Sequence, residues 1–362
     1  MSGIKSLRLS NVRSHSKADF LFARDINAIV GPNGSGKTTI IEALYTLLRG
    51  SSFKGSMSEI AQYGSDQFRA EMTVKSDTTD HERSLGFQKV DNAIQKKWSI
   101  DGKKYARLPV SARLPVVLFE PDLARLVSGG PERRRNYIDH LAGQLDLSVA
   151  LAQNRFERTL KQRNQLLKKL REQHLATVPD ELFIWNTQLA TLSEQIIKSR
   201  LQLIETLQQE ISEYYKELGG TDEVQLHYQS TVSVAPLSYA SQLLHHLETY
   251  VQRDIALGHT AYGPHRDDIA IHLADQPAAE RASRGEVRTV VIALKLLETK
   301  LLSRHFEDND IKPTLLLDDV LSELDLTHQE RVLAGFKDHQ VFITTTDAHA
   351  LTPGVHTIAL GQ

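Results

Sequence analysis

The segment Gly-Pro-Asn-Gly-Ser-Gly-Lys-Thr-Thr at residues 31–39 constrains the fold more than any other feature of this chain. It fits the phosphate-binding loop pattern G-x-x-x-x-G-K-[ST], with Gly31, Gly36, Lys37 and Thr38 at the fixed positions. Glycines let a backbone wrap phosphate groups, and the free N–H groups of a helix N-terminus face an anion. The pattern therefore predicts a site for a nucleoside triphosphate, provided that a strand precedes the loop and a helix follows it.

Both flanking segments meet that condition. Residues 26–30 form a short apolar run typical of a buried strand, and residues 39–48 carry apolar side chains at helical spacing. Lys37 is expected to reach the β- and γ-phosphates of ATP, and Thr38 to ligate Mg²⁺. The predicted nucleotide-binding residues of this loop are Gly31, Pro32, Asn33, Gly34, Ser35, Gly36, Lys37, Thr38 and Thr39.

A second motif lies far downstream, where residues 314–319 read Thr-Leu-Leu-Leu-Asp-Asp. This pattern indicates an apolar strand that ends in two acids. In phosphate-loop enzymes the first such acid supports Mg²⁺, which is the role expected for Asp318. Asp319 is expected to act as a base or to position the attacking water. Lys37, Asp318 and Asp319 are thus the predicted catalytic residues, although an acidic turn after a strand is also common in α/β proteins.

The spacing of the two motifs predicts an insertion, because about 280 residues separate Lys37 from Asp318. The intervening sequence favours helices. The sequence up to residue 130 and that from 257 return to β-rich and α/β patterns, so 1–130 and 257–362 are expected to form one lobe and 131–256 an inserted helical lobe. The predicted elements of the insertion are helices at 133–174 and 181–218, a strand-like stretch at 223–234 and a helix at 239–255.

Composition excludes several kinds of protein. The chain has no cysteine, which excludes disulfides, thiolate metal sites and cysteine nucleophiles, and it has a net charge of −2. Any DNA-binding surface must therefore be a local patch. The N-terminus lacks the apolar core of a signal peptide, and no run approaches the roughly 18 apolar residues of a membrane span. A cytoplasmic protein without a membrane partner is expected.

Three further segments carry polar groups where a nucleotide could be sensed. Ser283 and Gly285 precede an amphipathic helix and could bind an anion supplied by a second copy of the chain, or simply cap the helix. Asp325 follows the acid pair, where sandwich-dimer ATPases cross their dimer interface. Thr346 follows a strand whose hydroxyl groups could sense a γ-phosphate. Ordinary α/β turn chemistry is the alternative for the last two.

Together these segments resemble the heads of ABC-type ATPases of the structural-maintenance-of-chromosomes group, and the RecF family within it. The family-specific stretches are residues 114–121 with 131–135, and Tyr-Gly-Pro-His-Arg-Asp-Asp at 262–268. The resemblance implies an ABC-type P-loop ATPase head in the α/β class, with a mixed β-rich N-terminal part, a doubly wound core and an inserted all-helical lobe.

The resemblance also implies a function. Such proteins bind ATP, form a head-to-tail homodimer that clamps duplex DNA near single-strand gaps, and assist loading of a strand-exchange recombinase with mediators of the RecR/RecO type. Hydrolysis is slow and DNA-dependent. By the same resemblance Ser283, Gly285 and Glu286 contact the partner's γ-phosphate, Asp325 lies at the dimer seam and Arg13 approaches the nucleotide. Thr346 stands where transporter-type ATPases have a switch histidine, and threonine cannot act as a base.

DNA contacts are predicted only weakly. The candidates are Arg133, Arg134, Arg135, Lys161 and Lys168, within a basic run that also includes Arg163. Sequence-independent binding needs only such cations, but a charge run is more often a solvated helix face. The alternatives to a RecF-like protein are another ABC-type ATPase, such as a transporter subunit, and a phage-defence ATPase subunit.

Overall fold

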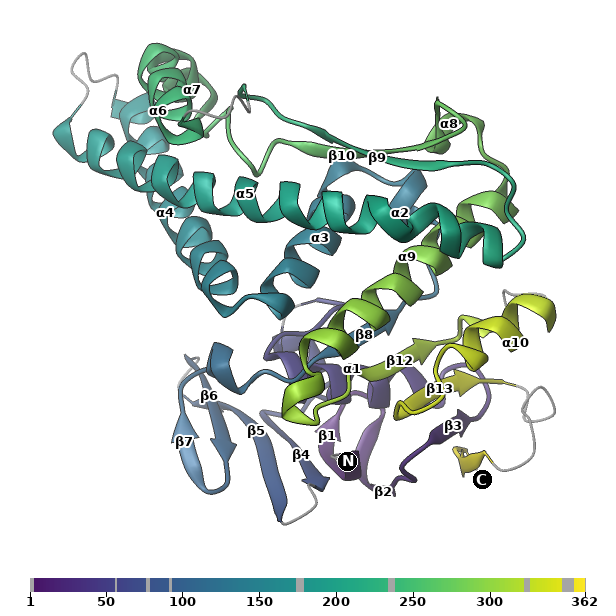
Figure 1. Ribbon diagram of the computed structural model, residues 1–362. Coiled ribbons are helices and arrows are strands. Elements are labelled where there is room, and N and C mark those ends of the chain that lie inside the picture. Colours follow the sequence, from purple (N-terminus) through teal and green to yellow (C-terminus); the bar gives the residue numbers. More distant parts are fainter. Residues whose placement is uncertain are drawn as a thin grey trace. The chain divides into compact units, whose positions relative to one another are not determined.

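The chain folds into two compact units in the computed structural model (Figure 1). The model describes residues 3–55, 57–75, 79–90, 93–173, 179–233, 238–321, 326–346 and 355–361. The first unit comprises Met1–Leu123 with Glu298–Gln362, and the second comprises Ala124–Leu297. The second unit therefore includes residues 257–297, which the sequence had grouped with the first lobe.

The first unit contains a five-stranded parallel sheet in the order β14-β3-β13-β12-β8. Its strands are short and apolar because they are buried, and every residue of β12 and β13 is buried. Parallel strands end at the same edge, so the loop after β3 lies beside the ends of β12 and β13. The strand bounds are β3 Ile26–Val30, β8 Val116–Phe119, β12 Thr314–Asp318, β13 Val341–Thr345 and β14 His356–Ala359.

A six-stranded antiparallel sheet in the order β2-β1-β4-β5-β6-β7 forms the other layer of this unit. Its strands alternate, as β4 shows with Phe68, Ala70 and Met72 buried between more exposed neighbours. A two-residue hairpin turn at Asp101-Gly102 joins β6 to β7, with φ angles of 49° and 79° at the two turn residues. The strand bounds are β1 Gly3–Val12, β2 His15–Leu21, β4 Gln67–Lys75, β5 Asp80–Val90, β6 Ala93–Ile100 and β7 Lys103–Tyr105.

Helix α1 (Lys37–Arg49) packs between the two sheets. One apolar cluster joins its Ile40, Ile41 and Leu44 to residues of the antiparallel sheet and to Leu316 and Phe342 of the parallel sheet. A helix buried on nearly all sides must be mostly apolar, and beyond its first turn α1 is so, with Glu42 and Thr46 as buried polar exceptions. Because α1 is fixed on both faces, the loop at its N-terminus has a rigid base. The first unit also contains α10, Leu326–Ala334.

The second unit combines helices with a small sheet. Helices α4 and α5 run antiparallel, and β9, β10 and β11 form a three-stranded sheet in the order β11-β10-β9 (Figure 1). The helix bounds are α2 Arg125–Ser128, α3 Pro131–Leu145, α4 Leu147–Gln173, α5 Asp180–Glu217, α6 Tyr239–Thr249, α7 Val251–Leu257, α8 Ala278–Arg281 and α9 Arg284–His305, the last of which continues into the first unit. The strand bounds are β9 Val224–Gln229, β10 Asp268–Leu273 and β11 Gln276–Pro277.

Two helices expected as continuous are interrupted. The helix predicted over 133–174 breaks at Asp146, whose backbone is extended (φ −137°, ψ 114°) and whose carboxylate accepts a hydrogen bond from Ser148 N at 2.7 Å. Aspartate is a favoured N-cap residue, and the one glycine of the predicted helix, Gly143, lies inside α3 rather than at the break. The helix predicted over 239–255 also divides, at Tyr250, where φ is −100° and ψ is 20° and the side chain makes no cap hydrogen bond. The expected strand at 223–234 is observed as β9, so the region 131–256 is not wholly helical.

Candidate nucleotide-binding site

The loop from Gly31 to Gly36 joins β3 directly to α1, as its sequence predicts. Gly36 adopts φ 93°, and a Cβ there would collide with the side chains of Ser14 and His15, so this position requires glycine. No side chain in the described part of the chain caps the N-terminus of α1. Its first N–H groups therefore remain available to an anion.

Lys37 is folded back over this loop. Its Nζ donates to the carbonyl oxygens of Gly31 at 2.6 Å and Pro32 at 3.0 Å, and the residue is only 8% exposed. The ammonium group is thus already placed at the mouth of the loop, where it can exchange carbonyl oxygens for phosphate oxygens. Pro32, Asn33 and Gly34 form the exposed crest of the loop.

Asp318 lies at the end of β12, beside Thr38 of α1. Its Oδ1 accepts hydrogen bonds from Thr38 Oγ1 at 2.8 Å and from Thr344 Oγ1 at 2.9 Å, and the residue is 1% exposed. The structure therefore brings together two predicted residues that are 280 positions apart in the chain. Thr344 belongs to the strand whose hydroxyl groups were expected to sense a γ-phosphate, but its contact with Asp318 was not predicted, because it depends on the order of the strands.

The second carboxylate oxygen of Asp318 fits a divalent cation. Oδ2 is buried and has no hydrogen-bond partner among the described residues, while Lys54 Nζ lies 3.8 Å from it. A carboxylate and a threonine hydroxyl are the hard oxygen ligands that Mg²⁺ prefers, and Mg²⁺ keeps several waters when the protein offers few ligands. No group of three or more His, Asp or Glu that could hold a metal occurs within the described ranges.

Asp319 has a different environment from its neighbour. It adopts φ 55°, a left-handed conformation that is uncommon outside glycine, and its N–H donates to Thr344 Oγ1 at 2.8 Å. The turn separates the two acids, leaving Asp318 buried and Asp319 partly exposed. Backbone outliers of this kind cluster at functional sites. The unusual backbone of Asp319 therefore supports a functional role for its carboxylate, which is partly exposed at this edge of the sheet.

The remaining predicted residues of the first unit occupy varied positions. Arg13 pairs with the buried Glu42 of α1 at 2.9 Å, so its guanidinium faces that helix. Thr346 is exposed just after β13. Asp325 lies outside the described residues, and its expected place at a dimer seam stays a prediction.

Ser283 and Glu286 form a capping box at the start of α9. Ser283 N donates to Glu286 Oε2 at 2.8 Å, and Glu286 N donates to Ser283 Oγ at 3.3 Å. These hydrogen bonds from Ser283 hold the pKa of the Glu286 carboxyl below its usual value. In the single chain Ser283 therefore acts as a helix cap, which was the alternative interpretation. Its contact with a second copy of the chain stays a prediction. A Cβ at Gly285 would meet only Ser283 Oγ, at 4.0 Å.

The candidate DNA-binding residues divide into two groups. Arg133, Lys161 and Lys168 are exposed. Arg134 instead makes two 2.8 Å bonds to Asp268, and Arg135 donates to the carbonyl oxygen of Asp267 at 2.6 Å, so both hold parts of the second unit together. Arg163 of the same basic run is fully buried, which excludes it as a surface contact in this fold.

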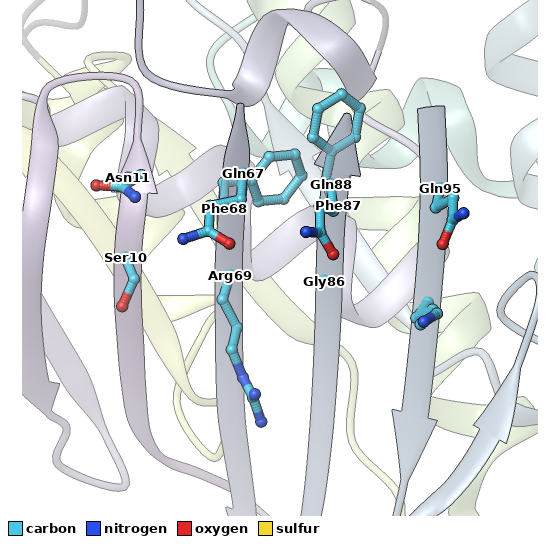
Figure 2. Close-up of a pocket in the computed structure, with 10 residues that line it drawn as sticks. Ser10, Asn11, Gln67, Phe68, Arg69, Gly86, Phe87, Gln88 and Gln95 are labelled. Atoms are coloured by element: carbon cyan, nitrogen blue, oxygen red, sulfur yellow. The ribbon is translucent and has the colours of Figure 1, made fainter. Parts of the chain in front are cut away.

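A polar surface that the sequence analysis missed lies on the antiparallel sheet (Figure 2). Gln67, Gln88 and Gln95 stand in register on three neighbouring strands, and the next row is formed by Arg69, Gly86 and Lys97. The hollow over these rows measures about 340 Å³, and its ten lining residues include two cations and no carboxylate. We call the two rows the glutamine face. The alternation of buried and exposed residues along β4 indicated that Gln67 and Arg69 share the exposed face. The residues that stand beside them on the neighbouring strands depend on the strand register, which only the structure gives.

The fold and the site together define the head of a P-loop ATPase of the ABC type. The family described as "RecF/RecN/SMC N terminal domain" matches residues 3–360. A DNA replication and repair protein RecF of Ruminiclostridium cellulolyticum is 33% identical over 351 residues, covering 95% of this chain and 92% of that protein. The RecF of Lachnoclostridium phytofermentans is 32% identical, with the same shares covered. The chain therefore belongs to the RecF/RecN/SMC N-terminal-domain family.

Solved structures agree with this assignment. The recombination mediator protein RecF with ATPrS has a TM-score of 0.86 and 28% identity, covering 97% of this chain and 94% of that chain. The Smc head domain derived from Pyrococcus furiosus has a TM-score of 0.51 at 16% identity and shares the fold alone. The expected family and fold class are confirmed. Within the described residues, no helix is long and apolar enough to cross a membrane.

Proposed function

We propose that this chain is an ATP-dependent DNA-binding protein of recombinational repair and replication. The observation that carries the proposal is the joint arrangement of Lys37, Thr38 and Asp318, which supplies a phosphate-binding cation and two hard oxygen ligands at one rigid edge. A solved RecF relative is described with ATP. Lys37 would bind the β- and γ-phosphates, while Thr38 and Asp318 would hold Mg²⁺, which supplies charge neutralisation for phosphoryl transfer.

Hydrolysis is proposed to be slow and stimulated by DNA. Asp319 is the acid that would position the attacking water, and many fast ATPases of this type have the longer glutamate at that place. A misplacement of about 1 Å lowers a rate by about 100-fold. Binding, rather than turnover, would then be the working signal. Turnover of hundreds per second with DNA would overturn this part of the proposal.

The bound nucleotide is proposed to join two copies of the chain head to tail. Ser283, Gly285 and Glu286 of one copy would contact the γ-phosphate held by the other, and Asp325 would lie at the seam. The dimer would clamp duplex DNA near a single-strand gap. A ligand shared by two protomers favours the dimer in proportion to its differential affinity for it.

Light scattering with ADP and with ATP plus Mg²⁺ tests this arrangement. Wild-type protein is expected to dimerise only with ATP, and Ser283→Arg to raise the dimer dissociation constant by about 100-fold, or roughly 2.7 kcal/mol. Ser283→Ala removes both the hydroxyl that caps α9 and the proposed phosphate contact. Ser238→Ala is its matched control, because Ser238 caps α6 by accepting from Ser241 N at 3.2 Å. A monomer under every condition, or equal effects at Ser283 and Ser238, would contradict the sandwich dimer.

The glutamine face supports a sequence-independent contact with the DNA backbone. Arg, Lys, Asn, Gln and Ser side chains are the usual partners of phosphate oxygens, and these types line its hollow without any acid. Arg133, Lys161 and Lys168 remain proposed contacts on the second unit. Contacts of this kind are additive and depend on salt rather than on base sequence.

Paired substitution of Arg69 and Lys97 by alanine tests the glutamine face. DNA affinity is expected to fall by about 10-fold at low salt, and the slope of log affinity against log salt concentration to decrease by about 2. Fluorescence anisotropy with duplex DNA over a salt series measures both. Arg8→Ala is the control, since Arg8 matches Arg69 in exposure (62%) and in its acid partner (Asp19 at 2.7 Å, as Glu71 is to Arg69) but does not line the hollow. An unchanged slope would exclude this face.

Mediator partners of the RecR/RecO type and a role in loading a recombinase are proposed from the RecF relatives, one of which is described within the RecFOR pathway. A cytoplasmic location would suit these partners. Another ABC-type ATPase, such as a transporter or phage-defence subunit, is the second candidate, but the similarity to RecF proteins along nearly the whole chain favours the first.

A further inference from the structure

The two oxygens of the buried Asp318 carboxylate have different partners. Two threonine hydroxyls donate to Oδ1, whereas Oδ2 is buried without a hydrogen bond from any described residue. Burial of a charged oxygen without compensation is strongly unfavourable. The cation recorded beside Oδ2 is Lys54, whose Nζ lies 3.8 Å away. A lysine ammonium is a compact charge on a flexible stem, which suits it to this partial role.

The segment that carries Lys54 is held in place. Ser52 Oγ accepts hydrogen bonds from Lys54 N at 3.0 Å and Gly55 N at 3.3 Å, and it donates to Glu42 Oε1 at 2.5 Å. Glu42 is 1% exposed on α1. Phe53 meets the ring of Tyr45, also on α1, edge to face. The backbone of Lys54 is thus fixed to the helix that begins at the phosphate-binding loop, and only its side chain is free to change direction.

Oδ2 of Asp318 is also the oxygen that a metal ion would use. Thr38 and Asp318 offer the hydroxyl and the carboxylate that suit Mg²⁺, and Oδ1 is already engaged by two donors. Two cations within about 4 Å of one another repel in any dielectric. The ammonium of Lys54 and a Mg²⁺ ion on Oδ2 therefore compete for the same carboxylate oxygen.

We propose that Lys54 is a built-in counter-ion of Asp318, which occupies the metal side of the site before nucleotide binds and is displaced by Mg²⁺. The inference rests on the proposed Mg²⁺–ATP site and adds a positioning residue to it. Lys54 supplies a positive charge beside Oδ2 in the nucleotide-free protein. Lys54 also raises the Mg²⁺ concentration that the site requires, because Mg²⁺ must compete with it for Oδ2. Removal of Lys54 should therefore lower the Mg²⁺ concentration at half-maximal binding.

The test compares wild type with Lys54→Met, which keeps the length of the stem and removes the charge. Binding of a fluorescent ATP analogue is titrated with Mg²⁺, and thermal unfolding is measured without nucleotide or metal. Lys54→Met is expected to lower the Mg²⁺ concentration at half-maximal binding by about 10-fold, which is 1.4 kcal/mol. Its melting temperature without ligand is expected to fall. Lys17→Met, an exposed lysine on β2, should change neither quantity.

A double-mutant cycle isolates the pair. In an Asp318→Asn background the loss of Lys54 should leave the melting temperature unchanged, because the charge it neutralises is gone. If Lys54→Met does not fold, Lys54→Gln carries the same measurements.

The outcomes separate the inference from the proposed function. Wild-type protein that binds no nucleotide would overturn the proposed function. Wild-type binding together with an unchanged or higher Mg²⁺ midpoint in Lys54→Met would overturn only the counter-ion role, as would full additivity in the double-mutant cycle. A higher midpoint would mean that Lys54 assists the phosphates instead.

Discussion

Replacing Lys37 by alanine is expected to lower the affinity for ATP by about 100-fold and to reduce hydrolysis below detection. Hydrogen bonds to charged groups contribute about 1.5–3 kcal/mol each, and 2.7 kcal/mol corresponds to 100-fold. In the nucleotide-free site the Lys37 ammonium donates to Gly31 and Pro32 carbonyl oxygens only 2.6 and 3.0 Å away. The positive charge of Lys37 therefore already lies beside the loop, and no residue from Gly31 to Gly36 could replace it in Lys37→Ala.

The measurement is nucleotide binding by anisotropy, with phosphate release from the same preparations. Lys37→Arg is the informative companion, because it keeps the charge but replaces a point donor by a planar fork that does not match the narrow loop. Lys17→Ala serves as the surface control. Circular dichroism would verify that the helix content is kept. Wild-type affinity in Lys37→Ala would remove the loop from the nucleotide site.

The local parts of this site could be predicted from the sequence because they depend on neighbouring residues. The strand, loop and helix around Gly31–Thr39 need only the loop pattern and the apolar runs beside it. The meeting of Thr38 with Asp318 followed from the two-part architecture of phosphate-loop sites, not from any local signal. Thr344 and Lys54 could not be found in this way, because their roles come from strand order and from a loop that returns to the carboxylate.

For Ser283, Glu286 and Arg163, the sequence contained signals of the roles that the structure shows. Ser283 and Glu286 have the spacing of a capping box, which predicts the hydrogen bonds that they form. Arg163 was placed with surface cations because of its charge. Yet the buried positions of α4 recur at helical spacing and include it, namely Phe156, Thr159, Arg163, Leu167 and Leu170. Periodicity, rather than charge, identifies the face on which a helical residue lies.

Arg163→Ala is expected to destabilise the second unit by about 3–5 kcal/mol, the usual effect of removing one partner of a buried ion pair. Arg163 donates from Nη1 to Asp254 and to Thr260, and from Nε to Asn186, each at 2.7 Å. Both members of the ion pair are at most 1% exposed. Burial lowers the pKa of Arg163, and the charge of Asp254 together with its hydrogen bond opposes that shift. Without Arg163 the carboxylate of Asp254 remains in the interior.

Guanidinium-induced unfolding followed by circular dichroism measures the effect, with each unit's transition treated separately because a chain of two units need not unfold in one step. Lys161→Ala, two residues away and exposed, should change the stability by less than about 0.5 kcal/mol. Arg163→Lys should not restore it, since a single ammonium cannot reach both Asn186 and Asp254 as the fork does. A DNA contact would behave in the opposite way, because alanine at an exposed Arg163 would weaken DNA binding and leave unfolding unchanged. Loss of stability with unaltered DNA affinity in the folded protein would establish Arg163 as part of the core.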